Sequence, residues 1–379
     1  MANNKPFKIK NGLSAKVYLQ SSSALSASDV DVSAGSYFSK TLTANTTLTF
    51  SNPPASGLAS SFALEITGAS VNTPYDLANG VKLSPEHSFA STHRPFGLTF
   101  KPDGTKVYIN SHGSASLYEY SLSTAWDITT LGTADDSQVV GFTSWSNTVS
   151  TDGTKIYAAG SGKIKQWTMT TAWDLSTAGS AIEYTFPSNT DTGTVGVFFK
   201  SDGTELYMIG YNNRIVYRFT LTTPWVVNTA SYSSVFFDAS TEVISVSGLF
   251  FTTDGLQMYI PCYSTEKIYK YALSTAWDIT TASYTQTSLD VASVDTNARS
   301  IWIKPDGTRL YMNGDTSDKM YEFNIAAGGP ATVSYPSSVK WPEGTAPDAP
   351  AAGEKDVYVF ITSDGGSNYY GKQAGDAVA

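Results

Sequence analysis

The chain of 379 residues is poor in the residue types that carry most metal and thiol chemistry. It has one cysteine, Cys262, and three histidines, His87, His93 and His112. A single cysteine cannot form an internal disulfide, and the histidines do not show the spacing of metal ligands. We therefore expect no metal and no cofactor, and we expect an inert thiol in a loop at Cys262.

Charge and long apolar runs are also scarce. Charged residues make up 15% of the chain, the net charge is -9, and no basic cluster is longer than Lys8-Ile9-Lys10. Phosphate binding needs a dense Lys/Arg surface, so nucleic acid is excluded as an expected partner. No apolar run approaches the ~20 residues of a spanning helix, and no signal peptide follows Met1. The sequence predicts a protein assembled in a cytoplasm, without membrane insertion.

A repeated phrase is abundant instead. Five copies place Asp-Gly between two β-rich runs, which is the signature of a tight hairpin. The repeat length is 49 to 52 residues, in the range of propellers and solenoids. Each period reads as four strands, which is one propeller blade. The repeated aspartates are Asp103, Asp152, Asp202, Asp254 and Asp306.

A second phrase, of the type LSTAWDITT, follows the third run in four copies. We interpret its tryptophans, Trp126, Trp173, Trp225 and Trp277, as wedges between blades. We interpret Asp127, Asp174 and Asp278 as turn-stabilising residues. The fifth copy lacks this phrase, but residues 75–89 have a similar pattern of residues, an aromatic residue followed by Asp-Leu and then a β-like stretch. These residues are predicted to complete the last blade and close a ring of five blades, with six as the nearest alternative.

The two ends of the chain predict a separate domain. Residues 37–43, 46–50 and 61–67 read as strands, and residues 356–372 read as a hairpin. The predicted fold is all-β, with a five-bladed β-propeller inserted into a small, jelly-roll-like β-sandwich formed by the N- and C-terminal segments. The predicted boundaries are an arm at 1–25, a sandwich at 26–73 plus 327–379, and a propeller at 74–326.

The repeats and the ends resemble known families. The phrase KPDGTKVYI at residues 101–109 and its copies resemble the hairpins of YVTN and TolB-like propellers, and LSTAWDITTASY resembles repeats of marine phage and bacterial proteins. The terminal segments resemble structural proteins of tailed phages, including cyanophages. This resemblance implies a virion component, of the fibre or appendage type, that carries an exposed propeller. It also implies docking to other virion proteins through Phe7, Lys8, Ile9, Lys10, Asn11, Gly12 and Leu13.

Differences between the repeats predict where a ligand binds. The Asp-Gly turns and the Trp-Asp phrases are uniform and should share one end of the ring. The loops after the second strands and the connections between blades differ in every copy and should share the opposite end, which we call the variable end. Its aromatic, amide and charged side chains suit a glycan. The candidates are His93, Arg94, His112, Trp145, Tyr211, Asn213, Arg214, Tyr263, Arg299 and Asp315, with Tyr211 and Trp145 foremost.

Three functions fit these observations. The first is a phage tail fibre or appendage that attaches to a host glycan or receptor. The second is a capsid decoration or head fibre, and both place the protein in a virion as a homotrimer. The third is a polysaccharide-degrading enzyme, which needs two facing carboxylates. Asp295, Asp315 and Glu266 are its candidates, but their spacing singles out no pair, and the chain is expected not to be an enzyme.

Overall fold

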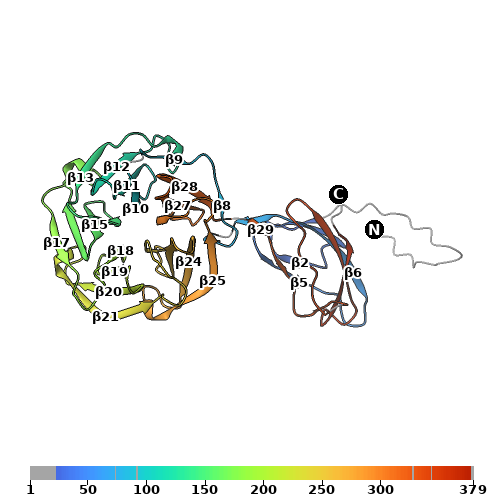
Figure 1. Cartoon of the computed structure of the whole chain (residues 1–379). Helices are drawn as coiled ribbons and strands as arrows, with labels where there is room; N and C mark the ends of the chain where they lie inside the picture. The colour runs from blue at the N-terminus through green and yellow to red at the C-terminus, as the bar shows by residue number, and fades with distance from the viewer. Residues whose placement is uncertain (1–22, 73, 91–92, 327, 343, 377–379) are drawn as a thin grey trace, which may run out of the picture. The chain divides into compact units, whose positions relative to one another are not determined.

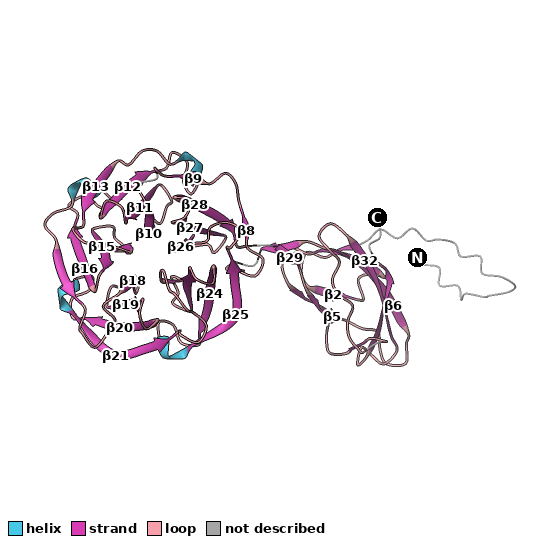
Figure 2. Cartoon of the chain, in the orientation of Figure 1, coloured by secondary structure: helices cyan, strands magenta, loops and turns pink. Residues whose placement is uncertain are grey.

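The computed structural model describes residues 23–72, 74–90, 93–326, 328–342 and 344–376, and these ranges consist mainly of strands and loops (Figure 2). Helix is limited there to four 3-10 turns, so no described helix is long and apolar enough to cross a bilayer. The chain divides into two compact units, one of residues 73–327 and one of the segments on either side. The predicted docking residues Phe7 to Leu13 lie outside the described residues.

The unit of residues 73–327 is a ring of five β-sheets, with β10 and β18 near its centre and β13, β17 and β21 at its rim (Figure 1). The all-β class and the count of five blades are therefore confirmed. Blade 1 consists of β10 (Pro95–Phe100), β11 (Lys106–Ser111), β12 (Ser116–Ser121) and β13 (Asp136–Val139). Blade 2 consists of β14 (Ser146–Val149), β15 (Lys155–Gly160), β16 (Lys163–Thr168) and β17 (Ile182–Thr185). Blade 3 consists of β18 (Thr194–Phe199), β19 (Glu205–Gly210), β20 (Ile215–Leu221) and β21 (Ala230–Asp238). Blade 4 consists of β22 (Phe250–Phe251), β23 (Gln257–Cys262), β24 (Lys267–Leu273) and β25 (Ala282–Asp290).

Blade 5 combines strands from the beginning and the end of the propeller sequence. Its first three strands are β26 (Ala298–Ile303), β27 (Arg309–Gly314) and β28 (Lys319–Asn324), and its outer strand is supplied by β8 (Val81–Lys82) and β9 (His87–Ser88). Phe323 pairs with Lys82, and Met320 pairs with His87. The predicted closure through residues 75–89 is confirmed, and it leaves β28 without an open edge.

The second strand of a blade is buried on both faces, because its alternate side chains enter different layers between blades. In β11, Val107 and Ile109 pack in one apolar layer with Tyr311 of blade 5. Tyr108 points into the next layer with Ile156 of blade 2. These strands therefore read as almost continuous apolar runs, as expected for strands covered on both sides.

An aromatic residue packs on the glycine of each Asp-Gly turn and hydrogen-bonds to it. In blade 3, Gly203 has a φ of +72°, and a Cβ atom there would lie 2.3 Å from the Trp225 ring. The Trp225 amide donates to the Gly203 carbonyl at 3.0 Å. Trp225 also packs in the layer that holds Tyr157 of blade 2, so its predicted packing role is confirmed. The equivalent backbone hydrogen bond, from the aromatic residue's amide to the carbonyl of the turn glycine, is made by Trp126, Trp173 and Trp277 and, in blade 5, by Tyr75.

The aspartates after these tryptophans cap short turns. Asp127, Asp174 and Asp278 each accept a hydrogen bond from the backbone amide two residues later, at 3.0 to 3.2 Å, and each begins a 3-10 turn. Their side chains therefore replace backbone acceptors at a turn. The predicted turn-stabilising role is confirmed.

Buried tyrosines join each blade to the next. The Tyr157 hydroxyl of blade 2 donates to the backbone carbonyl of Trp225 in blade 3 at 2.6 Å. Tyr108, Tyr207 and Tyr311 make the corresponding bond to the tryptophan of the following blade. In blade 4, Lys270 instead donates to the Tyr75 carbonyl at 2.9 Å. Each junction thus satisfies a carbonyl that the sharp aromatic turn would leave unpaired.

The second unit interleaves the two terminal segments of the chain. Its six-stranded sheet has the order β1-β3-β6-β32-β33-β31. The central pair is antiparallel, from Lys355 opposite Thr67 to Thr362 opposite Ser60. Phe38, Phe62 and Phe360 lie in one shared core. The bounds are β1 (Ser23–Ala24), β3 (Tyr37–Thr41), β6 (Ser60–Thr67), β31 (Val339–Lys340), β32 (Lys355–Thr362) and β33 (Tyr369–Gly375).

Only short ribbons accompany this sheet in the described residues. They are β2 (Asp29–Asp31) with β5 (Thr49–Ser51), β4 (Thr46–Thr47) with β30 (Val333–Ser334), and β7 (Ser70–Asn72) with β29 (Gly328–Pro330). The predicted jelly-roll-like sandwich is therefore not confirmed. The insertion point is clear from the backbone, since the Ala331 amide donates to the Ala69 carbonyl at 2.8 Å.

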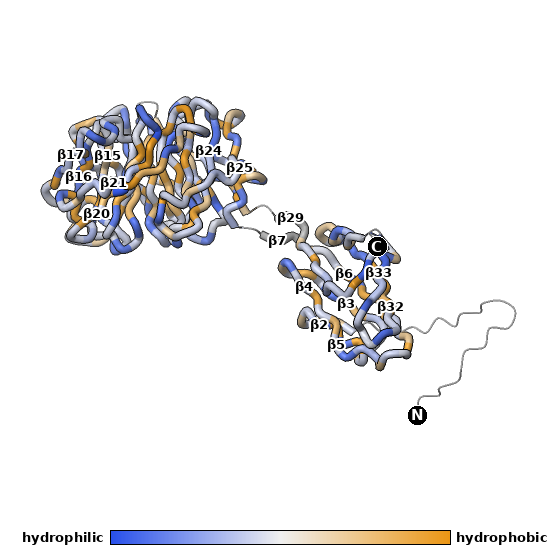
Figure 3. The backbone as a smooth tube through the Cα atoms, turned by 90° about the horizontal axis from the view of Figure 1, so that it is seen from below, coloured by the Kyte–Doolittle hydropathy of each residue, from blue (hydrophilic) through white to orange (hydrophobic). Residues whose placement is uncertain are grey.

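Hydropathy follows the strands in both units. Blue and orange segments alternate along the backbone tube in Figure 3. This pattern is typical of strands that bury apolar side chains between sheets and expose polar turns.

Candidate binding site

Backbone hydrogen bonds assign the loops to two ends of the propeller. The Asp-Gly turns bond to the aromatic phrases, as described above. The loops after the second strands bond instead to the connections between blades, for example through the His112 amide to the Arg94 carbonyl at 3.0 Å and the Tyr211 amide to the Gly193 carbonyl at 2.7 Å. The predicted separation into a uniform end and a variable end therefore agrees with the backbone pairing.

A buried carboxylate organises the variable end. Asp315, in the loop after β27, accepts two hydrogen bonds from Arg94, at 2.9 and 3.0 Å, and one from Arg299 at 2.8 Å. Asn297 adds a fourth bond at 3.0 Å. The Asp315 side chain is 3% exposed and that of Arg299 is 9% exposed, whereas that of Arg94 is 44% exposed. Asp315 and Arg299 thus form a desolvated ion pair, and Arg94 covers it.

Aromatic rings from three other blades surround the Arg299 guanidinium. Its central carbon lies 4.5 Å from the ring centroid of Phe96, 5.1 Å from Tyr263 and 5.3 Å from Trp145. Cation–π attraction and burial therefore both hold this side chain in place. Tyr211 extends the group, because its hydroxyl lies 2.8 Å from that of Tyr263. Residues from all five blades thus meet in one cluster at the variable end.

The electrostatics of the cluster keep Asp315 ionised. Burial raises the pKa of Asp315, but the hydrogen bonds and charges of Arg94 and Arg299 outweigh burial and hold that pKa below its ordinary value. The pKa of His112 is lowered, first by burial and then by the charge of Arg94, whose Nη1 atom lies 3.2 Å from the His112 Nδ1 atom. His112 therefore contributes a neutral ring at pH 7.

Trp145 and Tyr211, the two foremost candidates, line the same pocket. Its volume is about 180 Å³, and Ser161, Thr194 and Val195 complete its wall. Tyr211 is 40% exposed, so its ring is available to a ligand. Thr194 is buried, so the indole, the phenol and the exposed Ser161 side chain are the groups that can offer flat apolar surface and a hydrogen-bonding hydroxyl.

Three predicted residues lie apart from this cluster. His93 stacks on Phe89 with ring centroids 5.2 Å apart, and burial lowers its pKa to about 4. Asn213 shapes its own loop by accepting from the Ile215 amide, and Arg214 donates to the Asn212 carbonyl. Their side-chain contacts are those of packing and turn residues, so we do not include these three in the site.

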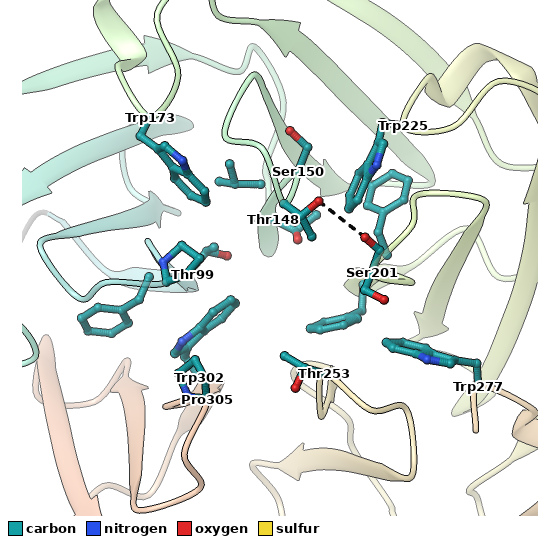
Figure 4. A pocket seen from close by; sticks show the side chains of 16 residues that line it. Thr99, Thr148, Ser150, Trp173, Ser201, Trp225, Thr253, Trp277, Trp302 and Pro305 are labelled. Atoms are coloured by element: carbon teal, nitrogen blue, oxygen red, sulfur yellow. Dashed lines mark hydrogen bonds between the residues drawn. The ribbon is translucent and has the colours of Figure 1, made fainter. Parts of the chain in front are cut away.

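A second cavity lies on the ring axis at the uniform end (Figure 4). Its volume is about 140 Å³, and its wall is mostly apolar. Trp173, Trp225, Trp277 and Trp302 surround it, and Thr148, Ser150, Ser201 and Thr253 line its sides. Sequence reasoning missed this cavity, because it treated the tryptophans as wedges alone. Phe96 was missed as well, because it reads as a strand residue.

The structure places the carboxylates considered for glycoside hydrolysis in three different settings. Asp315 is occupied by two arginines, as described above. Asp295 accepts hydrogen bonds from the Asn297 amide at 2.9 Å and the Ser317 hydroxyl at 2.5 Å. Glu266 occupies a turn with a φ of +55°. Asp315 is therefore engaged in an ion pair, and Asp295 is engaged in hydrogen bonds that shape its loop.

Other reactive groups are embedded in the fold. Cys262 is fully buried as the last residue of β23, not in a loop as predicted, and its sulfur lies 3.5 Å from the Ser264 hydroxyl oxygen. The loop prediction was wrong because the strand extends one more pair, with Cys262 opposite Lys267. Among the described residues, no group of three histidine, cysteine or acidic side chains is placed to hold a metal ion.

Comparison with known proteins finds propellers among solved structures. No family model matches the chain, and no curated protein matches it. A structure described as a 6-phosphogluconolactonase from Bacteroides fragilis is 13% identical, with a TM-score of 0.38, over 55% of this chain and 59% of that one. A periplasmic gluconolactonase from Pseudomonas aeruginosa is 15% identical, with a TM-score of 0.40, over 63% and 70%. The propeller domain of Swd1 from Myceliophteria thermophila is 12% identical, with a TM-score of 0.38, over 63% and 99%.

These similarities concern the fold. The chain spans just under three fifths of the first of these structures. At such identities, the lactonase activity of two of the neighbours does not transfer to this chain, since one propeller fold hosts many functions.

Proposed function

We propose that this chain is a non-catalytic attachment protein, a tail fibre or appendage of a bacteriophage, whose propeller binds a host-surface glycan through the pocket between Trp145 and Tyr211. The observation that carries the proposal is the pocket itself. Two aromatic side chains from loops that differ in every blade line one opening at the variable end. Divergent loops on a repeated scaffold are positions where binding residues can be placed without loss of the fold.

The chemistry of the pocket favours a sugar over a charged ligand. The nearby charges are already paired, because Asp315 binds both Arg94 and Arg299. What remains accessible is the ring of Tyr211 and the exposed side chain of Ser161. A ring face can pack on the C–H groups of a sugar, while hydroxyl groups exchange hydrogen bonds with its hydroxyls.

The virion assignment rests on the resemblance of the terminal segments to tailed-phage proteins. We propose that these segments form a β-sandwich that joins a homotrimer to the particle. A capsid decoration or head fibre remains the alternative. Electron microscopy of particles that carry a labelled copy of the chain would distinguish the two, because the label would lie on the tail or on the head.

A glycan array probed with the full chain tests the binding role. We expect binding to a defined set of glycans, with an affinity at least tenfold weaker for Tyr211→Ala, equivalent to about 1.4 kcal/mol. Trp145→Phe should weaken binding while it preserves an aromatic ring beside Arg299. Tyr370→Ala is the matched control, because Tyr370 is 62% exposed and belongs to the other unit. Equal binding by Tyr211→Ala and the wild-type chain would refute the proposed site.

The same array addresses catalysis. Glycans that are bound by the wild-type chain should be recovered at full length after prolonged incubation. Shortened products would contradict the non-catalytic assignment and would direct attention to carboxylates outside the cluster.

A further inference from the structure

The axial cavity at the uniform end has the size and character of a pocket for one apolar side chain. Its volume of about 140 Å³ is close to the roughly 150 Å³ of an apolar cavity that takes up benzene. Phe198 and Trp302 lie in its wall with the tryptophans of the turns, and the rim residues Ser201 and Thr253 are exposed. The cavity therefore offers a phenyl ring a fitting space that is open at this end.

Aspartates adjoin the residues that line the cavity. Five residues of the cavity wall or rim are each followed directly in sequence by the aspartate of an Asp-Gly turn, and all five aspartates are exposed. Lys101, Lys200 and Lys304 pair with three of them, at 2.8 to 3.0 Å. Asp152 and Asp254 have no lysine or arginine within 4 Å among the described residues. The rim therefore carries a net negative charge.

The chain itself contains a segment of complementary chemistry. Residues 1–28 include four lysines and no acidic residue, so the rest of the chain must carry -13 to reach the net charge of -9. Three of these lysines, Lys5, Lys8 and Lys10, flank the apolar side chains of Phe7 and Ile9. This combination of one aromatic side chain with adjacent positive charges matches an apolar cavity with an acidic rim.

We propose that the uniform end of the propeller is a docking site for the N-terminal segment of this chain, with Phe7 in the axial cavity and the lysines facing the turn aspartates. This inference is independent of glycan binding, because it concerns the opposite end of the ring. It assigns the tryptophans a binding role in addition to their packing role. In a head-to-tail arrangement, the segment of one copy would bind the propeller of another.

A labelled peptide tests the docking site directly. The probe is a fluorescein-labelled peptide of residues 3–13, and the receptor is the full chain with Phe7→Ala, which weakens competition by its own segment. Fluorescence anisotropy should show saturable binding, with Kd on the order of 100 µM, because one anchored side chain must offset the lost freedom of the peptide. Affinity should fall at least fivefold between 50 and 500 mM salt, since the attraction involves exposed charges.

Matched variants locate the bound peptide. A peptide with Phe7→Ala should bind at least tenfold more weakly, and Ser201→Trp in the receptor should block binding by filling the rim. Asp152→Asn with Asp254→Asn should weaken binding without obstructing the cavity. Val139→Trp is the control for added bulk, because Val139 is 68% exposed on the outer strand β13, and it should bind as the unmodified receptor does.

Three results would overturn the inference. They are no saturable binding, unchanged affinity after Ser201→Trp, and equal affinity of the wild-type and Phe7→Ala peptides. None of these results depends on glycan binding, which involves the variable end and is measured separately on the same receptor. Failure of this inference is therefore distinguishable from failure of the glycan site.

Discussion

Replacement of Asp315 by asparagine tests whether the ion pair at the variable end holds the five blades together. The substitution keeps the shape of the side chain but removes its charge, and it leaves the Arg299 guanidinium buried. The side chains of Asp315 and Arg299 are only 3% and 9% exposed. Removal of one partner from such a buried pair costs about 3–5 kcal/mol. Arg94 adds little to this cost, because it is 44% exposed and its charge is screened by solvent.

We therefore expect Asp315→Asn to lower the free energy of unfolding by about 3 kcal/mol at pH 7. For a domain of this size, that change lowers Tm by roughly 6–12 °C, which differential scanning calorimetry can measure. Asp290→Asn is a suitable control, because Asp290 is exposed and belongs to a blade edge. A double variant with Arg299→Met should recover part of the lost stability, since it removes the unpaired charge.

The pH dependence provides a second check. Because the pKa of Asp315 in the folded chain is below its ordinary value of 3.8, its stabilising effect is present above that value and is lost as the pH falls through the folded pKa. The difference in stability between wild type and Asp315→Asn should thus be constant near pH 7 and shrink below about pH 4. A loss of less than 1 kcal/mol at pH 7, or a difference independent of acid pH, would refute the reasoning.

Two further predictions concern the packing of the ring. Gly203→Ala should destabilise the propeller by about 2 kcal/mol or more, because the new Cβ would meet the Trp225 ring at 2.3 Å and the φ of +72° disfavours alanine; Gly132→Ala, which meets nothing within 4 Å, is the control in the same denaturant titration. Burial lowers the pKa of His93 to about 4, so the unfolded chain takes up its proton first and stability should fall from about pH 6.5 toward pH 4. His93→Gln should flatten that part of the curve, and an unchanged curve would show that other groups cause the decline.

The repeat could be predicted because its determinants are local. Residues equivalent to Gly203 and Trp225 recur at matching positions in the repeats. The turn, the packing of the aromatic ring on it and the number of blades therefore follow from short phrases. Closure was also predictable, because Tyr75 occupies in its segment the place that a tryptophan has in the others. The terminal unit was harder to predict, since the partners of β6 lie almost 300 residues away in β32 and their arrangement depends on long-range pairing.

The candidate site was only partly predictable. Loop divergence identified Trp145, Tyr211 and Arg299, because diversity within one chain marks positions without a common packing role. It could not show that His93 points into a stack with Phe89, because side-chain direction in a loop depends on contacts between blades. The axial cavity was missed for a related reason: the residues that face it come from five strand ends and meet only when the ring closes.

The backbone bond between Ala69 and Ala331 has a consequence for how such a chain can change. The polypeptide leaves the terminal unit and returns to it at adjoining points, with Asn72 opposite Gly328 in the β7–β29 ribbon. A whole propeller can therefore be exchanged at this junction by recombination, and the terminal unit keeps all of its own strands. Under the proposed function, such a replacement would change the bound ligand and leave the terminal unit unaltered.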